Sequence, residues 1–181
     1  MADTPLRPTL AVPLPGVRLR PWHLHDAPVL AEQANDRGIW ENLRDIFPHP
    51  YRLEDAYWYI GLTTDPASTD IHLAIEVAGE AVGAISVLFK DDINRCSAEI
   101  GYWLGRGYWG RGIVPEAVKV LTQYTFAHFE VSRLYAEIFA RNTGSARVLT
   151  KAGYQFEARL HKSIVKEGIV QDALLFATLK S

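Results

Sequence analysis

The chain has 181 residues, of which 48% are hydrophobic and 22% are charged, and this composition fits one domain with a substantial core. The formal net charge of −2 argues against a broad surface for nucleic acid or anionic membranes, because both partners require an excess of basic residues. Cys96 is the only cysteine, which excludes an intrachain disulfide and favours a reducing, cytoplasmic compartment. No apolar stretch reaches the length that crosses a bilayer, so we expect neither nucleic acid nor a membrane as a partner.

The first segment of the chain is rich in proline. Residues 1–15 hold four prolines and little charge, which predicts a flexible N-terminal arm, and one domain is expected over residues 16–181. The arm has either no role of its own or a role in subunit contacts, so a homodimer stays open as an alternative. The domain begins with an alternating segment, 17–22, which predicts a short strand.

The next segments predict three helices and then three strands. Helical patterns cover residues 25–36, 39–45 and 53–63. We expect His25 or Asp26 to cap the first of these helices. Strand patterns cover residues 71–77, 81–89 and 97–104. Because these strands follow one another through short turns, they are expected to form an antiparallel meander.

The second half of the chain changes pattern at a glycine-rich segment, 105–112. After it, a long helix, a strand, a second helix and two closing strands are predicted, over residues 113–129, 134–140, 142–152, 154–163 and 170–179. The sum is about seven strands and four or five helices. We therefore expect an α/β (α+β) domain with a mixed, mostly antiparallel central sheet flanked by helices.

The glycine-rich segment lies between a predicted strand and the long helix. Such a turn presents backbone N–H groups at a helix N-terminus, where the macrodipole favours an anion such as phosphate. Gly110 and Gly112 let a phosphate approach the backbone, and Arg111 adds a positive charge. A purely structural turn and a dinucleotide-binding loop are the alternatives. The second is disfavoured, because the preceding strands form hairpins and Glu130, at the distance of the expected acidic residue, ends a helix.

At this point the sequence resembles a known family. Residues 98–104 (AEIGYWL) and 109–117 (WGRGIVPEA) resemble the acetyl-CoA motif of the GNAT superfamily, most closely its RimJ/RimL-like branch of ribosomal-protein N-terminal acetyltransferases. Both glycine positions of the family pattern Q/R-x-x-G-x-G/A fit, whereas Gly107 replaces its first residue, which removes a side chain but not the backbone cradle. The resemblance implies a GNAT fold, acetyl-CoA as cosubstrate, no metal, and cofactor contacts from Trp103, Leu104, Gly110, Arg111, Gly112 and Ile113.

A second motif strengthens the resemblance. Residues 142–154 resemble the branch's signature of Asn, Ser three residues later, and Lys-x-Gly-Phe/Tyr. The residues alone also allow a well-capped helix, since Asn142 is a good N-cap. In the branch, the Asn and Ser positions contact the pantetheine arm and the thiol end of CoA, which the resemblance implies for Asn142 and Ser145. Together with shorter matches, the resemblance spans roughly residues 16–180.

The expected chemistry follows from what an amine needs in order to attack a thioester. A protonated amine is not nucleophilic, and an α-amine, with a pKa of about 7.7–8.0, needs only mild help to lose its proton. We expect Glu99 to be the general base; an exposed strand residue or a loop-orienting carboxylate is the alternative. Backbone N–H groups near Leu104 are expected to stabilise the oxyanion, and Gly101 predicts a bulge or splay that frees them. Ser145 is expected to donate a proton or a hydrogen bond to the CoA thiolate.

The leading hypothesis is an N-acetyltransferase that transfers acetyl from acetyl-CoA to a primary amine by direct attack in a ternary complex. A protein N-terminal α-amine is the first acceptor considered, and a small amine such as a polyamine, an amino acid or an antibiotic is the alternative. The rival from another class is a sensor domain that binds acetyl-CoA without turnover. The presence of Glu99, Asn142 and Ser145 argues against the sensor.

Overall fold

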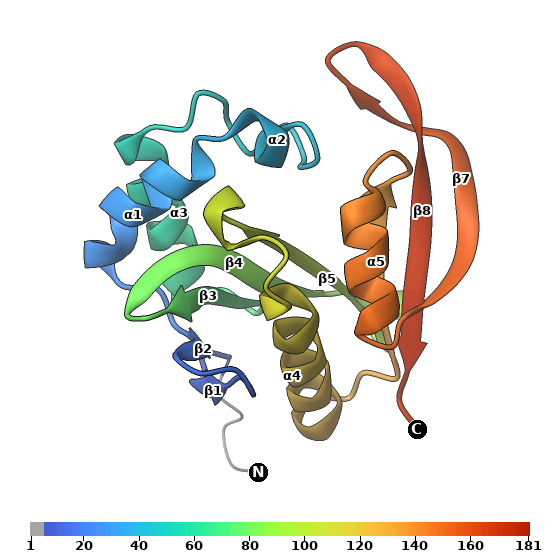
Figure 1. Cartoon of the computed structure of the whole chain (residues 1–181). Coiled ribbons are helices and arrows are strands. Elements are labelled where there is room, and N and C mark those ends of the chain that lie inside the picture. The colour runs from blue at the N-terminus through green and yellow to red at the C-terminus, as the bar shows by residue number, and fades with distance from the viewer. Residues whose placement is uncertain (1–5) are drawn as a thin grey trace.

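Two neighbouring strands of the sheet are buried on both faces. β3 (Ile71–Val77) and β4 (Glu80–Phe89) consist mainly of Ile, Val, Leu and Ala residues, and most of these side chains are buried. Strands without a solvent-facing side need helices on both faces of their sheet. The computed structural model, which describes residues 6–181, has this arrangement (Figure 1).

One sheet contains all the strands, in the order β1-β2-β3-β4-β5-β6-β8-β7. The other strands are β1 (Leu10–Ala11), β2 (Val17–Arg20), β5 (Ser97–Leu104), β6 (Arg133–Phe139), β7 (Gln155–Lys166) and β8 (Ile169–Leu179). Neighbouring strands are antiparallel except for β5 and β6, which are parallel. The predicted mixed, mostly antiparallel sheet and the meander of β3, β4 and β5 are therefore confirmed.

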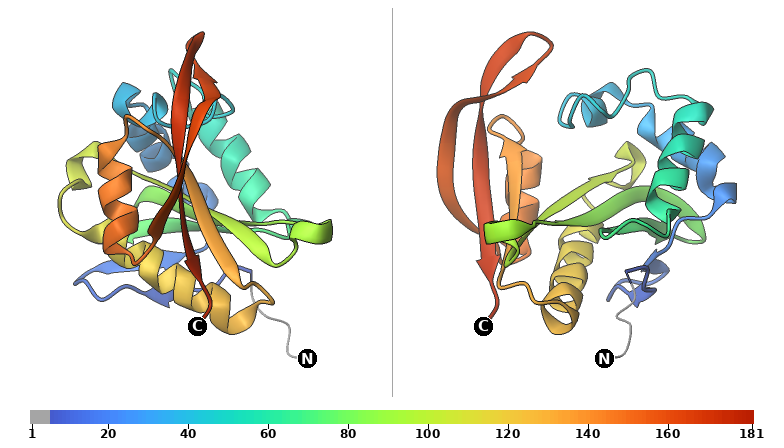
Figure 2. Two further views of the ribbon diagram at one scale, coloured as in Figure 1. Left: turned by 90° about the vertical axis from the view of Figure 1, so that its right-hand side faces the viewer. Right: turned by 180° about the vertical axis from the view of Figure 1, so that it is seen from behind.

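Helices cover the two faces of this sheet (Figure 2). The helices are α1 (Ala27–Ala34), α2 (Arg37–Trp40), α3 (Leu53–Thr64), α4 (Ile113–His128) and α5 (Thr143–Lys151), with short 3-10 turns η1 (Leu24–Asp26), η2 (Asp92–Asn94) and η3 (Arg106–Tyr108). α4 and α5 pack on one face, over a core that includes Leu121 and Leu134, and α1 and α3 pack on the other, over a core that includes Leu30 and Ile60. Within the described chain, no helix is both long and apolar enough to span a membrane.

The N-terminal segment is more ordered than its composition predicts. Leu10 and Ala11 form β1, which pairs antiparallel with β2, and Val12 is only 6% exposed. The expectation of a flexible arm is therefore wrong for residues 10–12, because apolar side chains between the prolines reach the core. This strand also raises the strand count from about seven to eight. The rest of the predicted arm includes residues 1–5, which lie outside the described part of the chain.

The first two helices start differently from the prediction. α2 lies earlier and is shorter than expected, since the side chain of Asp36 accepts a hydrogen bond from the Ile39 N–H (3.1 Å) and thereby fixes its N-terminus. The Asp26 carboxylate does not cap α1. It accepts a hydrogen bond from the backbone N–H of His23 instead (2.8 Å), which closes the turn η1.

Strand β7 is longer than predicted and continues past Ser163 to Lys166. It does so through an irregular stretch, where its register with β8 shifts and Lys162 has a positive φ of 53°. The Asp172 carboxylate on β8 holds this stretch, because it accepts hydrogen bonds from the Lys162 N–H (2.8 Å) and from Arg159 (2.7 Å). The β7–β8 hairpin therefore extends well beyond the rest of the sheet (Figure 1).

A buried ion network joins the first strands to helix α1. Arg20 of β2 donates hydrogen bonds to Asp26 (2.7 Å) and to Glu76 of β3, and all three side chains are at most 7% exposed. Burial opposes ionisation of both carboxyl groups, but hydrogen bonds from the arginines outweigh it and hold the pKa of Asp26 and of Glu76 below their ordinary values. Removing one member of such a network leaves a buried charge without compensation.

Replacing Arg20 by Met is expected to lower the free energy of unfolding at neutral pH by about 3–5 kcal/mol, because Asp26 then stays buried without its arginine and Glu76 keeps only the half-exposed Arg18. Carboxyl groups with lowered pKa values stabilise the fold above their unfolded pKa, so the difference should shrink as the pH falls below about 4. Urea unfolding at neutral and acidic pH measures both effects. As a control, Arg18→Met removes a 53% exposed partner of Glu76 and should cost about 1 kcal/mol or less. An equal loss in the two variants contradicts this account.

Candidate active site

Strands β5 and β6 pair over a short stretch and then separate. The last parallel pair is Glu99 with Tyr135, and β5 then continues as far as Leu104 beside β4 alone. Alternate residues of an antiparallel strand direct both backbone groups to the same neighbour. Because Gly105 donates its N–H to a carbonyl of β4 (2.8 Å), the backbone groups of Tyr102 and Leu104 face the gap between β5 and β6.

Gly101 was expected to produce either a bulge or a splay, and the structure shows a splay without a bulge. The register of β5 with β4 is continuous from Ala98, opposite Phe89, to Leu104, opposite Gly83, so the predicted bulge is absent from this described strand. The splay lies on the β6 side, because β6 pairs along its whole length with β8 and follows that strand. Backbone donors near Leu104 are therefore freed by the divergence of two strands.

The glycine turn leads from β5 through η3 into α4. Gly110 and Gly112 both have φ of 76°, a conformation that side chains disfavour, and Gly112 occupies the N-cap position of α4. A Cβ atom at either glycine would meet no atom within 4 Å, so the space in front of both backbones is open. Ile113 and Val114 lie in the first turn of the helix, where no preceding helical carbonyl is available to accept a hydrogen bond from their N–H groups. Together with the macrodipole of α4, this turn provides a place for a phosphate group.

Side chains around the glycine turn hold it in shape. Arg111 donates a hydrogen bond to the Gly107 carbonyl (2.7 Å) and lies over the ring of Tyr108, so it fastens the turn as well as adding positive charge. Trp109 donates its indole N–H to the Leu104 carbonyl (2.6 Å). That bond ties the turn to the end of β5 and occupies the Leu104 carbonyl, so Leu104 presents its N–H to the gap beside the backbone groups of Tyr102.

Helix α5 begins on the other side of the gap. The Asn142 side chain accepts a hydrogen bond from the Ser145 N–H (3.0 Å), so its predicted capping role is confirmed. The Ser145 hydroxyl lies 2.7 Å from the Tyr102 hydroxyl. Burial raises the pKa of Tyr102 more than the hydrogen bond with Ser145 lowers it, so the phenol stays protonated. Sequence reasoning missed Tyr102, although residues 98, 100, 102 and 104 alternate onto this face.

Glu99 and Trp103 point to the opposite face of the sheet. The Glu99 carboxylate, 12% exposed, accepts hydrogen bonds from Arg44 and from Lys90 (3.1 Å). The Trp103 ring packs edge-on against Phe47, with ring centres 5.8 Å apart. The structure therefore brings Leu104, the glycine turn and Ser145 around the gap, but it places the Trp103 side chain with the helices of the other face.

Residues 37–47 connect this face to the tip of the β7–β8 hairpin. Lys166 is 2% exposed, lies over the ring of Trp40 (3.9 Å) and forms an ion pair with Asp45 (2.8 Å). Arg141, which follows β6, donates a hydrogen bond to the Glu41 carbonyl. The segment that carries Arg44 is thus fixed from the hairpin and from the end of β6. Sequence reasoning missed these contacts, because they join residues about a hundred positions apart.

Comparison with known proteins matches this geometry. Residues 17–155 match the family model described as Acetyltransferase (GNAT) domain. The chain belongs to the GNAT family. Its relative N-acetyltransferase p20 of Bacillus licheniformis is 29% identical over 164 residues, which are 90% of this chain and 92% of that protein.

Solved structures of GNAT enzymes share the whole fold. The microcin C7 self-immunity acetyltransferase MccE, in complex with acetyl-CoA and AMP, has a TM-score of 0.82 and 22% identity, over 98% of this chain and all of that one. RimL, a ribosomal L7/L12 α-N-protein acetyltransferase, in complex with coenzyme A, has a TM-score of 0.83 and 19% identity, over 95% and 98% of the two chains. The predicted fold and the RimJ/RimL-like resemblance are confirmed, and the chain is an acetyl-CoA-dependent N-acetyltransferase.

The residues of this GNAT domain fit acetyl-CoA. The turn at Gly110 and Gly112 offers free N–H groups and an open approach to a pyrophosphate. The β5 backbone that faces the gap offers donors and acceptors to the amides of the pantetheine arm. Among the described residues, no three His, Cys, Asp or Glu side chains converge to hold a metal ion.

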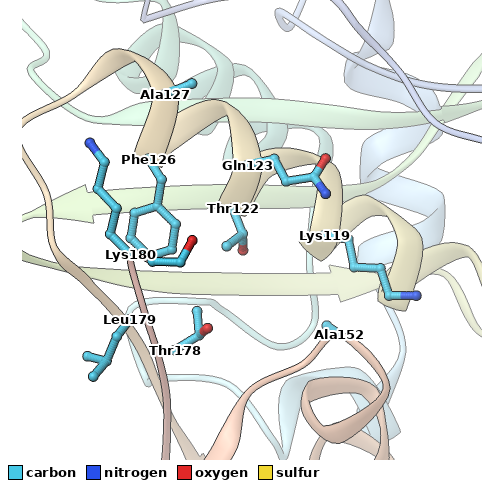
Figure 3. Close-up of a pocket in the computed structure, with 10 residues that line it drawn as sticks. Lys119, Thr122, Gln123, Phe126, Ala127, Ala152, Thr178, Leu179 and Lys180 are labelled. Carbon is cyan, nitrogen blue, oxygen red and sulfur yellow. The ribbon is translucent and has the colours of Figure 1, made fainter.

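A further carboxylate and one cavity lie near Glu99, and a second cavity lies elsewhere on the domain. Glu137 of β6 is exposed, lies two residues past Tyr135 on the face of Glu99, and has no hydrogen bond or ion pair with any residue that the structure describes. The Lys90 cavity, about 450 Å³, lies on the same face and is lined by Lys90, Asn94, Ser97, Arg133, Tyr135 and Leu175. A second cavity, about 420 Å³, lies between the second half of α4 and the end of β8, away from the glycine turn (Figure 3).

Replacing Gly112 by Ala is expected to raise the Kd for coenzyme A about tenfold or more, because its methyl group enters the open space through which the phosphate approaches. An L-residue with φ near 76° also costs about 1–2 kcal/mol, which favours a shift of the free turn away from the binding conformation. Isothermal calorimetry measures the Kd, with circular dichroism to verify the fold. Gly107→Ala is the matched control, since Gly107 lacks a positive φ and has open space around it. Equal Kd values for the two variants contradict the assignment of the turn to phosphate binding.

Proposed function

We propose that this enzyme acetylates the α-amine of a protein N-terminus by direct attack in a ternary complex. The observation that carries the proposal is the single carboxylate Glu99 on β5, next to the gap. One carboxylate is enough to deprotonate an α-amine, whose pKa is about 7.7–8.0, but is poorly matched to a lysine-type amine, with a pKa of about 10.4. The similarity to RimL, which acts on ribosomal L7/L12 α-amines, supports the same acceptor class. A small amine acceptor is the alternative.

In this proposal the backbone does most of the cofactor binding. The N–H groups around Gly110, Gly112 and Ile113, with the charge of Arg111 nearby, bind the pyrophosphate. Asn142 and Ser145 at the start of α5 lie beside the pantetheine arm. Acetyl-CoA supplies the thioester whose carbonyl the amine attacks. The Leu104 N–H, directed into the gap, stabilises the negative charge that develops on the carbonyl oxygen.

The same proposal gives Glu99 the role of general base. The acceptor arrives as an ammonium ion, takes the place of the exposed Arg44 side chain beside the carboxylate, and transfers one proton to Glu99. The neutral nitrogen then forms a bond to the thioester carbon. As the carbon–sulfur bond breaks, the nitrogen loses its second proton to water, and the sulfur leaves with the electron pair of the broken bond. Lys90 stays on the other carboxylate oxygen and keeps Glu99 oriented.

Glu99→Gln is expected to lower kcat with a peptide acceptor by about 10²–10³-fold, because the amide cannot accept the amine proton, while the Kd for coenzyme A changes little. Free thiol release measures kcat. Glu137→Gln is the matched control on the neighbouring strand and should keep at least half of the activity.

The outcomes of this experiment are distinct. A loss only in Glu137→Gln moves the base to β6. If unaltered enzyme binds coenzyme A but releases no thiol with peptides, polyamines or amino acids, the domain is a sensor and the proposed function is wrong.

The leaving group is assisted from the other face of β5. The Tyr102 and Ser145 hydroxyls lie 2.7 Å apart, and either one could be the donor. In this proposal Tyr102, whose pKa is raised by burial, is the donor, which leaves the Ser145 hydroxyl proton for sulfur. The CoA sulfur leaves as a thiolate that accepts this hydrogen bond. Because a thiolate with a pKa of about 8.5 is only moderately basic, one hydroxyl donor is enough.

Ser145→Ala is expected to lower kcat about 10²-fold and Tyr102→Phe about tenfold, since the first removes the donor to sulfur and the second only its orientation. Pre-steady-state thiol release measures the chemical step. Tyr154→Phe is the control for a buried tyrosine, because its hydroxyl bonds Thr122 (2.8 Å), away from the gap. If Tyr154→Phe is as slow as Tyr102→Phe, the effect is one of packing.

A further inference from the structure

The Lys90 cavity begins at the proposed base. Lys90 reaches from the end of β4, and its ammonium group lies 3.1 Å from the Glu99 carboxylate and 5.7 Å from the centre of the Tyr135 ring. Its side chain is 33% exposed. Partial burial disfavours its charge, but the hydrogen bond to Glu99 and the nearby Tyr135 hydroxyl outweigh this and raise the pKa of Lys90. The cavity therefore contains a permanent positive charge in direct contact with Glu99.

The second cation of the cavity is Arg133. Its guanidinium group forms two hydrogen bonds with Glu157 of β7, one of them 2.6 Å long, and lies 5.9 Å from the centre of the Tyr135 ring. Among the described residues that line the cavity, none is a carboxylate. Both cations thus find their counter-charges at its rim, in Glu99 and Glu157.

Two further charged side chains, Arg44 and Glu137, lie on the same face as Glu99. Arg44 contacts the second oxygen of the Glu99 carboxylate, so this one negative charge already has two cations. Glu137 lies on the same face, two residues past Tyr135 and so on the side away from Arg133. Two carboxylates, Glu99 and Glu137, therefore lie where the strands part, and Arg133, with its partner Glu157, lies toward their paired end.

An acceptor amine changes the balance of charges around Glu99. When its ammonium group takes the place of Arg44 and transfers a proton to Glu99, the carboxyl group becomes neutral, and Lys90, which is two-thirds buried, loses its counter-charge. A partly buried charge without compensation is costly. A negative group on the acceptor, placed in the cavity beside Lys90, removes that cost. A second positive group on the acceptor increases it.

Resting on the proposed function, we propose that the acceptor carries an acidic side chain within its first two residues and that the Lys90 cavity binds this group. Lys90 is the specificity-determining residue, since it contacts both Glu99 and the interior of the cavity. The site then selects a zwitterionic N-terminus and rejects polyamines, which bring only positive charge.

Tripeptide amides with Glu, Gln or Lys at the first or second position, and Ala elsewhere, test the proposal. We expect kcat/KM, followed by thiol release, to fall about tenfold from Glu to Gln and again from Gln to Lys in at least one position. In Lys90→Gln the Glu-to-Gln ratio should fall close to one, whereas Lys90→Arg should preserve it. Lys180→Gln, which removes an exposed lysine next to the chain's C-terminus, is the matched control and should keep the full ratio.

The results separate this inference from the function on which it rests. Equal rates for the Glu, Gln and Lys peptides at both positions overturn the acidic subsite but leave N-terminal acetylation intact. So does a ratio that survives in Lys90→Gln. If no peptide releases thiol, the proposed function fails, and the inference fails with it.

Discussion

The separation of β5 from β6 after Glu99 is the constraint on which the site depends. A buried backbone N–H needs a partner, and the part of β5 beyond this point has one only on the β4 side. The strand therefore keeps a line of free donors and acceptors inside the domain. The side chains of β5 alternate between the two faces of the sheet beside this gap. Tyr102 points to α5, and Glu99 points to residues 37–47.

The strands part because each is bound more strongly to its other neighbour. β5 pairs with β4 from Ala98 to Leu104, and β6 pairs with β8 from Arg133 to Phe139, whereas β5 and β6 share only a short parallel ladder. The sheet thus consists of two halves that twist away from one another. Helices α4 and α5 lie across the two halves through one common apolar core. Packing of α4 and α5 on one face therefore supports both sides of the gap, and a cofactor site requires such support.

Local sequence patterns predicted the parts of the site that local forces build. The glycine turn was evident because only a residue without a side chain readily adopts φ of 76° before a helix, and Asn142 was evident because N-caps have a side-chain preference. Short turns likewise predicted the meander. Arg44, Lys90 and Glu137 were not found, since their importance depends on strand register and on a loop 55 residues from Glu99. The predicted start of α2 and the predicted length of β7 were wrong for a related reason. Each depends on a single side-chain hydrogen bond, which the hydrophobic pattern does not reveal.

The acceptor face behaves as one connected unit. The segment that holds Arg44 on Glu99 is itself held by Lys166, whose ammonium group lies over Trp40 and pairs with Asp45, and by Arg141 from the end of β6. Lys166 is almost fully buried, so its charge is satisfied only while the hairpin tip stays against this segment. The position of Arg44, and with it the electrostatic environment of Glu99, is consequently set by contacts with the tip of the β7–β8 hairpin and with the residue Arg141 after β6. Access of an amine to the carboxylate is thus a property of the hairpin and of residues 37–47 together, and not of β5 alone.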